Sequence, residues 1–213
     1  IEYRSHGSGT LIYVTDEAAT AGKVKVRVRD GDKDYTLKEL PAGSSYLLDL
    51  AQFNGHWYMA AGDVAEGKVS IYKDPVTTLR KTPITTALPI STLRVKNPEF
   101  VSFSQNARFV MVQGGSNFAV YDAERDRQYR YDTKLALTPA QKAVWMDGHR
   151  ISLIANGKAT VFDFDGTNMQ TLMAADPAFP IIFDRDYEAM YALAPSATTT
   201  GTTDLTRTEL IVK

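Results

Sequence analysis

The sequence contains no cysteine, which excludes disulfide scaffolds, thiol nucleophiles and cysteine-ligated zinc. It has only three histidines in 213 residues, so a histidine-rich metal site has few possible ligands. No apolar run approaches the roughly 18 residues that cross a bilayer, so we expect no direct membrane insertion of this segment. The 24 Lys and Arg residues nearly cancel the 25 Asp and Glu residues, which gives no support to nucleic-acid binding through bulk charge.

Short alternating runs favour β-strands along nearly the whole chain. The clearest run is Lys23–Arg29, in which cationic and apolar residues alternate, so a strand there has one basic and one apolar face. No segment combines a helical period with caps, and the best helical candidate, Thr138–Lys142, is about one turn long. Other β-branched or aromatic runs predict strands at Thr10–Thr15, Trp57–Ala60, Lys68–Tyr72, Phe109–Val112, Asn117–Tyr121, Ile151–Ile154, Thr160–Phe164 and Glu209–Val212.

The predicted strands recur as an internal repeat. Each copy contains a strand, a tight turn, a second strand, a short loop and a third strand, which ends in Asp at Asp122 and Asp163, and most copies continue into a fourth strand. First strands begin near residues 1, 46, 100, 143 and 181, a spacing of roughly 38–54 residues. A four-stranded unit of about 40–45 residues is typical of a propeller blade. The alternative is an antiparallel sandwich with accidental internal similarity.

The sequence therefore predicts an all-β fold, in which residues 1–213 form a single small β-propeller of about five four-stranded blades. The predicted units are 1–41, 42–82, 96–134, 141–173 and 179–213, with Thr77–Leu79 as the fourth strand of the second unit. The last unit stops after three strands, so either residues near Ile1–Ser5 complete it or the natural chain continues. Because the chain begins at Ile1 without a signal peptide, we interpret it as a processed or truncated piece, and we expect a monomeric domain.

The turns of these units resemble those of the TolB-type, WD40-like β-propeller repeats of bacterial proteins. Phe103–Arg108 and Trp145–Arg150 are similar to the family's Ser-Pro-Asp-Gly-Lys-like turn, although no Ser-Pro-Asp-Gly stands intact. Phe162–Leu172 is similar to the Asp-x-Asp-Gly-like turn that ends the third strand. The resemblance implies a propeller fold and an extracytoplasmic location, either periplasmic or at the cell surface. It implies no catalytic residues, because the family motif is structural.

Most polar residues in these turns have a structural explanation. Asn-Gly and Asp-Gly pairs supply the positive φ angles of two-residue hairpins, and Asp can cap its own turn, so Asp147 and Asp165 are predicted to form turns. His6, His56 and His149 all precede second strands, but equivalent turns of successive blades lie apart on a rim, so we expect no metal site. There is no P-loop and no G-x-S-x-G motif, and we expect no cofactor.

Candidate binding residues lie in long or acidic loops, because loops on a rigid scaffold usually carry binding. Two acidic pairs fall between second and third strands, and two long connections cover Thr82–Glu99 and the Thr-rich segment Pro195–Thr206. The candidates are Asp16, Glu17, Asp63, Glu66, Thr198, Thr199 and Asp204.

The sequence favours a non-enzymatic extracytoplasmic module of a bacterial envelope-associated protein, which binds a protein or a glycan through loops on one rim. The alternative is a five-bladed propeller glycoside hydrolase, which requires two carboxylates from different blades roughly 5–10 Å apart in a central funnel. Asp49 and Asp184 end predicted first strands, which line the axial channel. The basic face of Lys23–Arg29 is a third candidate, for an acidic polymer, although charged strand faces are more often simply solvated.

Overall fold

The chain folds as a series of antiparallel sheets. The computed structural model describes residues 2–7, 9–81, 87–137 and 141–210, and within these ranges nineteen strands form five sheets. Consecutive strands are neighbours in every sheet, so each sheet is a simple meander. In the same ranges there is one short helix, α1 (Pro75–Lys81), and no helix has the length and apolar character needed to cross a membrane.

The strands are grouped by sheet, in chain order. Sheet 1 contains β1 (Tyr3–His6), β2 (Thr10–Thr15), β3 (Lys23–Asp30) and β4 (Lys33–Pro41). Sheet 2 contains β5 (Tyr46–Phe53), β6 (His56–Asp63), β7 (Lys68–Lys73) and β8 (Ser91–Arg94). Sheet 3 contains β9 (Phe100–Phe103), β10 (Phe109–Gly114), β11 (Asn117–Asp122) and β12 (Arg127–Asp132).

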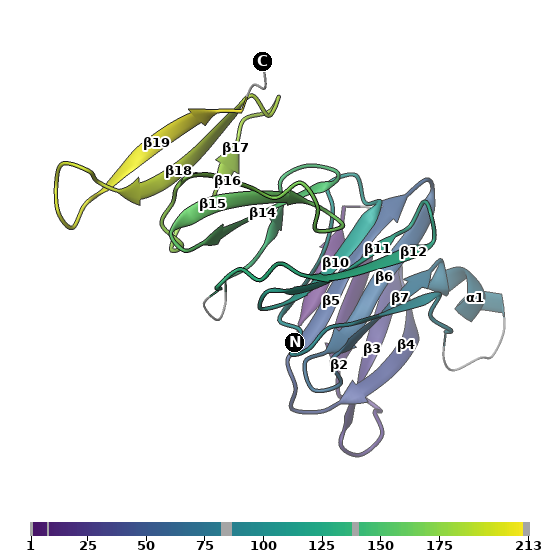
Figure 1. Cartoon of the computed structure of the whole chain (residues 1–213). Helices are drawn as coiled ribbons and strands as arrows, with labels where there is room; N and C mark the ends of the chain where they lie inside the picture. The colour runs from purple at the N-terminus through teal and green to yellow at the C-terminus, as the bar shows by residue number, and fades with distance from the viewer. Residues whose placement is uncertain (1, 8, 82–86, 138–140, 211–213) are drawn as a thin grey trace.

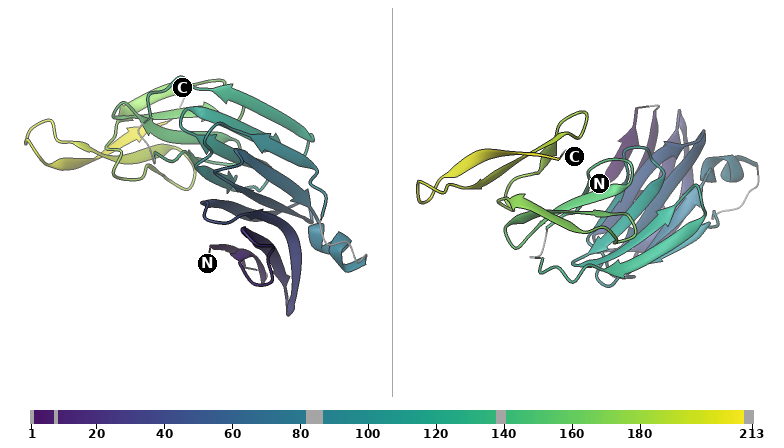
Figure 2. Two further views of the ribbon diagram at one scale, coloured as in Figure 1. Left: turned by 90° about the horizontal axis from the view of Figure 1, so that it is seen from below. Right: turned by 45° about the horizontal axis from the view of Figure 1, so that its top comes forward.

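Sheets 4 and 5 complete the described structure. Sheet 4 contains β13 (Val144–Trp145), β14 (Arg150–Ala155), β15 (Lys158–Asp163) and β16 (Gln170–Ala174). Sheet 5 contains only β17 (Ile182–Phe183), β18 (Ala189–Pro195) and β19 (Thr203–Glu209). The five sheets follow one another along an arc, with sheets 1 and 5 at opposite ends (Figures 1 and 2). The prediction of an all-β propeller-like fold with an incomplete last unit is therefore confirmed.

Apolar side chains fill the space between each sheet and the next. Four hydrophobic clusters lie between successive sheets, and the one between sheets 3 and 4 includes Phe109, Phe118 and Phe162. All six residues of β10 are buried, because sheet 3 has a neighbour on both faces. In β2, by contrast, buried and partly exposed residues alternate, because sheet 1 packs through one face only. The alternation of polar and apolar residues in β2 and β3 thus marks one end of the stack.

Some predicted strands are placed differently by the structure. Thr77–Leu79 lies in α1, and the fourth strand of sheet 2 is β8, within the connection expected at Thr82–Glu99. The helix forms there because Pro75 is its first residue, where the fixed φ of proline suits a helix and its missing N–H leaves no bond unmade. The alternative that Ile1–Ser5 completes the last unit is wrong, because Tyr3–His6 pairs with β2 as the first strand of sheet 1.

Two further predictions, for the last strand and for a helical turn, fall partly on residues outside the described ranges. The last strand was expected at Glu209–Val212, and residues 211 and 212 lie outside the described residues. Within them, β19 runs from Thr203, inside the Thr-rich connection, to Glu209. Its alternating Thr and polar residues suit a strand with one face in solvent. The helical turn expected at Thr138–Lys142 falls largely on residues 138–140, which lie outside the described residues, and Gln141 and Lys142 are not helical.

The predicted turn chemistry is confirmed at most of the glycine turns. Asn54-Gly55 and Asn156-Gly157 have positive φ at both residues, as two-residue hairpins require. Gly148 is an exception, because its φ is not positive. A Cβ there would lie 2.5 Å from the side-chain amide nitrogen of Asn106, so close approach of the neighbouring sheet explains this glycine.

Because the core lies between the sheets, substitutions there should lower the free energy of unfolding much more than substitutions on the exposed face of an end sheet. Phe162→Ala should lower the free energy of unfolding by about 3–5 kcal/mol, because the side chain is fully buried between sheets 3 and 4. Leu205→Ala should change it by less than about 0.5 kcal/mol, because Leu205 is 71% exposed on sheet 5. Denaturant unfolding of both variants checks this, and equal losses would show that the core does not lie between the sheets.

Candidate functional site: an outer cleft between sheets 1 and 2

A large concavity lies where sheets 1 and 2 meet at their outer edges. It has a volume of about 980 Å³ and runs between β4 and the connection from β7 to β8. Four lysines and three carboxylates line it together with two tyrosines and the apolar side chains of the connection. These lining residues include Lys23, Lys25, Lys38, Lys68, Asp34, Glu39, Glu66, Tyr35, Tyr72, Leu79 and Leu88.

Helix α1 fixes one wall of this cleft to sheet 1. Val76 and Leu79 pack against the hydrophobic cluster between sheets 1 and 2. Arg80 forms an ion pair with Asp30, and its Nε donates a 3.2 Å hydrogen bond to the hydroxyl of Tyr35. Figure 1 shows α1 projecting from sheet 2 beside β4. Helix α1, which follows β7, is therefore held against sheet 1 beside the cleft.

Lys38 enters the cleft from the packed face of sheet 1. The pairing of β3 with β4 shifts register between Val26 and Arg27, so that Val26 is paired with Lys38 and Arg27 with Thr36. Leu37 is the extra residue, and this bulge places Lys38 on the same side as the buried Val24, Val26 and Leu40. A lysine on the core-facing side of an outer strand is unusual, because its charge is partly removed from water.

The ammonium of Lys38 is half-buried in the cleft. Burial lowers its pKa, while the charges of Glu66 and Asp63 act in the opposite direction and that of Lys68 adds to the lowering. Among the described residues, no hydrogen bond or ion pair engages this ammonium. Asp63 is fully buried at the end of β6, and its Oδ2 also lacks a partner in the described structure. The cleft thus contains a half-buried cation that no side chain of the described structure pairs with.

The carboxylates of the cleft are already engaged. Hydrogen bonds from Arg29 lower the pKa of Asp34, and hydrogen bonds from the side chain and backbone of Thr20 lower that of Glu39. Glu66 lies 3.3 Å from Lys68, measured between Oε2 and Nζ. Carboxyl groups held ionised in this way suit recognition rather than proton donation near neutral pH.

The seven predicted site residues fall into two separate groups. Asp63 and Glu66 belong together, because the backbone N–H of Glu66 donates to Asp63 Oδ1 at 2.7 Å, and Glu66 lines the cleft. Asp16 and Glu17 lie exposed in the turn between β2 and β3, whose Ala18 and Thr20 also line the cleft. The first group, Asp16, Glu17, Asp63 and Glu66, is thus at or beside one end of the arc.

The second group lies at the other end of the arc. Thr198 and Thr199 form the turn between β18 and β19, where their backbone N–H groups donate to Ser196 Oγ at 3.3 and 3.2 Å. Asp204 is exposed on β19 opposite Ala194. Figures 1 and 2 show this hairpin far from sheet 1, so the structure does not bring the two groups together.

The histidines are also separated, each with its own local contact. His56 Nδ1 lies 2.5 Å from Asp74 Oδ2, and the ring of His6 meets Trp57 edge to face with ring centroids 5.2 Å apart. His149 Nδ1 lies 3.4 Å from Asp147 Oδ1. Among the described residues, no three His, Asp or Glu side chains form a cluster that could hold a metal ion.

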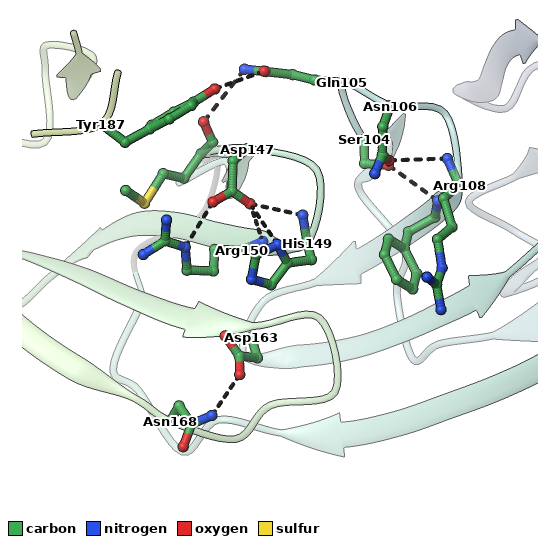
Figure 3. A network of polar contacts seen from close by, with 12 residues as sticks. Ser104, Gln105, Asn106, Arg108, Asp147, His149, Arg150, Asp163, Asn168 and Tyr187 are labelled. Carbon is green, nitrogen blue, oxygen red and sulfur yellow. Dashed lines mark hydrogen bonds and ion pairs between the residues drawn. The ribbon is translucent and has the colours of Figure 1, made fainter. Parts of the chain in front are cut away.

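The turns between first and second strands tie sheets 3, 4 and 5 together (Figure 3). Asp147 Oδ1 accepts hydrogen bonds from the backbone N–H groups of His149 and Arg150, both at 2.7 Å. Gln105 of sheet 3 accepts a 2.8 Å bond from the Tyr187 hydroxyl of sheet 5. Asp165 likewise accepts from Thr167 in its own turn. The prediction that Asp147 and Asp165 form turns is confirmed.

Asp49 and Asp184, the two residues considered for the hydrolase alternative, accept hydrogen bonds from backbone N–H groups. Asp49 accepts from the N–H of Leu50 at 3.0 Å and from that of Phe103, in the next sheet, at 2.8 Å. Burial nevertheless raises the pKa of Asp49. Asp184 Oδ1 accepts from the N–H of Glu188 at 2.8 Å.

Sequence reasoning missed Lys38, Tyr35 and Tyr72 as members of the site. A strict two-residue period places Lys38 on the solvent side of its strand, and only the three-residue spacing of Leu37 and Leu40 signals the bulge. Tyr35 and Tyr72 belong to different sheets, and no local pattern indicates that both face one cleft.

Comparisons with known proteins support the fold. No family model matches the sequence, and comparison with curated proteins finds no match. A candidate 6-phosphogluconolactonase from Bacteroides uniformis ATCC 8492 is similar with a TM-score of 0.51 and 9% identity, over 95% of this chain and 68% of that chain. A functionally unknown protein from Desulfotomaculum acetoxidans DSM 771 is similar with a TM-score of 0.52 and 10% identity, over 97% of this chain and 68% of that chain.

A third similar structure is the dihydro-heme d1 dehydrogenase NirN in complex with DHE. It gives a TM-score of 0.54 and 14% identity over 90% of this chain, and this chain spans 40% of its length. At such identities the likeness concerns the fold alone, and the folds are propeller-like.

The unpartnered ammonium predicts an unusual stability profile for Lys38→Met. At pH 7 this variant should be as stable as the wild type or more stable by about 1 kcal/mol, because an unpaired charge leaves the interior. A lysine whose folded-state pKa is lowered binds its proton more tightly in the unfolded chain, so the wild type gains stability as pH rises toward about 10.4. The difference between the two proteins should therefore shrink as pH rises through the lowered pKa of Lys38 toward about 10.4.

Urea unfolding at several pH values measures this difference, with Lys158→Met as the matched control. Lys158 is exposed at the start of β15, so its removal should leave the profile unchanged. A loss of more than about 1 kcal/mol at pH 7 in Lys38→Met would mean that Lys38 already makes a stabilising contact.

Proposed function

We propose that this chain is a non-enzymatic, extracytoplasmic binding module of a bacterial envelope-associated protein, and that it holds a glycan in the outer cleft. The extracytoplasmic, envelope-associated part rests on the resemblance of its turns to TolB-type repeats. The binding part rests on the outer cleft. We further propose that the domain acts as a monomer, with partners recognised on the outer side of the arc.

The observation that carries the proposal is the composition and construction of the cleft. A concavity of about 980 Å³ is of the size that small-molecule and oligosaccharide ligands occupy, whereas a protein partner usually needs a broad surface of about 800 Å² per side. Its walls combine the half-buried Tyr35 with charged groups, whereas Tyr72 is only 2% exposed and contributes little surface. Tyrosine offers an apolar ring for the C–H face of a sugar, and charged side chains form the stronger hydrogen bonds to hydroxyl groups.

The cleft is also preorganised, which lowers the entropic cost of binding. Packing between sheets 1 and 2 holds its floor, and the contacts of Arg80 with Asp30 and Tyr35 hold the wall formed by α1. The strands and the helix that form these walls therefore need little rearrangement when a ligand binds. This feature favours a binding role for the long connection between β7 and β8.

The glycoside hydrolase remains the second candidate because of one residue. The raised pKa of Asp49 is a property of a general acid, and Asp49 lies on a first strand. Against this, both carboxylate oxygens of Asp49 accept backbone N–H groups, and the charges that act on it are those of Arg4 and Lys142. In the outer cleft, the lowered pKa values of Asp34 and Glu39 disfavour proton donation.

Binding of defined oligosaccharides tests the proposal with the chain of 213 residues. Isothermal titration with cellohexaose, chitohexaose, mannohexaose and hexamannuronate should detect at least one complex with a dissociation constant below about 1 mM. Leu88→Asp, which places a charge on an exposed wall residue of the cleft, should weaken that complex at least about fivefold, and Lys158→Asp should not.

The same mixtures, analysed for new reducing ends, separate the two candidates. Intact oligosaccharide after prolonged incubation is the result expected of a binding module. Cleavage that is lost in Asp49→Asn would instead support the hydrolase, and absence of binding to all four probes would contradict the glycan proposal.

A further inference from the structure

The lysines that line the outer cleft outnumber the carboxylates that line it. Each lining carboxylate has a cationic partner: Asp34 with Arg29 at 2.9 Å, Glu39 with Lys23 at 3.8 Å, and Glu66 with Lys68 at 3.3 Å. Among the described residues, no hydrogen bond or ion pair engages Lys25 or Lys38, which also line the cleft. Two lysines are therefore available to a ligand, whereas the acids are not.

The two available lysines lie on opposite faces of sheet 1. Lys25 is paired across the strands with Glu39, on the side away from sheet 2, whereas Lys38 shares the packed side with Val26. Both line the same cleft, because β4 is the outer strand and the cleft passes over its edge. A ligand that contacts both lysines must follow this edge, so it must be extended and carry more than one negative group.

We infer that the outer cleft selects an acidic glycan, whose carboxylate groups bind Lys38 and Lys25 on either side of β4. This inference rests on the proposed function and names the ligand class of the same site. A chain of uronic acid residues supplies carboxylates at regular intervals along a stiff backbone, and the half-buried Tyr35 in the lining offers its rings an aromatic contact. A single small anion can satisfy only one of the two lysines.

Lys38 supplies the selectivity between acidic and neutral glycans. Its ammonium is half-buried, and Glu66 and Asp63 act on it through charge without bonding to it. A ligand carboxylate would give this ammonium its missing hydrogen-bond partner, and the attraction is stronger there than in bulk water because water is partly excluded. A neutral hydroxyl group would replace the lost hydration less well.

Binding should also change the protonation of Lys38. Burial lowers the pKa of Lys38 in the free protein, and a carboxylate beside it favours the charged form. Near the lowered pKa, formation of the complex should therefore take up protons. A binding site that only stacks the sugar ring on tyrosine would show no such uptake.

Hexamannuronate and mannohexaose test the inference, because they share a backbone and differ in the carboxylate groups. Titration calorimetry at pH 7 should give at least tenfold tighter binding of hexamannuronate, with an affinity that weakens as salt increases. Lys38→Met should reduce this preference at least about fivefold, Lys38→Arg should retain most of it, and Lys158→Met should leave it unchanged. Titrations at pH 9 in two buffers of different ionisation enthalpy should show proton uptake that is lost in Lys38→Met.

Each other outcome has a distinct meaning. Equal affinity for the two hexasaccharides, with no effect of Lys38→Met, would overturn the acidic-glycan inference while the proposed glycan-binding function stands. Binding of inorganic pyrophosphate as tightly as hexamannuronate would also overturn it, because the site would then be one for a small anion. No binding of either hexasaccharide would overturn the inference, and cellohexaose and chitohexaose then decide whether the proposed function fails with it.

Discussion

The packing of one apolar sheet face against the next is the constraint on which the rest of the structure depends. A single four-stranded meander has two faces and open edges, and it cannot bury enough apolar surface alone. In this chain both faces of sheets 2, 3 and 4 are covered, by the four clusters that include Met59, Val112, Phe162 and Met190. The order of the sheets along the arc follows from this packing, and so does the difference between inner and end sheets.

The outer cleft is a consequence of where this packing stops. Sheet 1 packs through one face, so its outer strand β4 is free to carry polar residues, and a bulge turns Lys38 toward the neighbouring sheet. The connection after β7 then crosses from sheet 2 to sheet 1 and is held by Arg80. Local irregularities on a regular scaffold thus create a concave surface with unsatisfied charge, which a stack of identical sheets lacks.

Regular features were predictable from the sequence, and irregular ones were not. Alternation in Lys23–Arg29 and the repeated turns at Asn54-Gly55 and Asn156-Gly157 report local conformation, so strands, hairpins and the number of sheets follow from them. Glu66 was placed in the right loop for the same reason. The cleft depends instead on a register shift and on contacts between segments about 45 residues apart, such as Arg80 and Tyr35, which periodicity does not encode. Asp204 was expected in a loop but lies on β19, and its separation from Asp16 around the arc could not be predicted from local sequence either.

Hydrogen exchange of the backbone amides, resolved by residue, tests the stacking account most directly. The account predicts the slowest exchange in β6, β10, β11, β14 and β15, whose residues are buried on both faces, and much faster exchange in β19 and in the outer strand β4. Equal protection of β19 and β10 would contradict it, because the two strands differ in having neighbouring sheets on both faces.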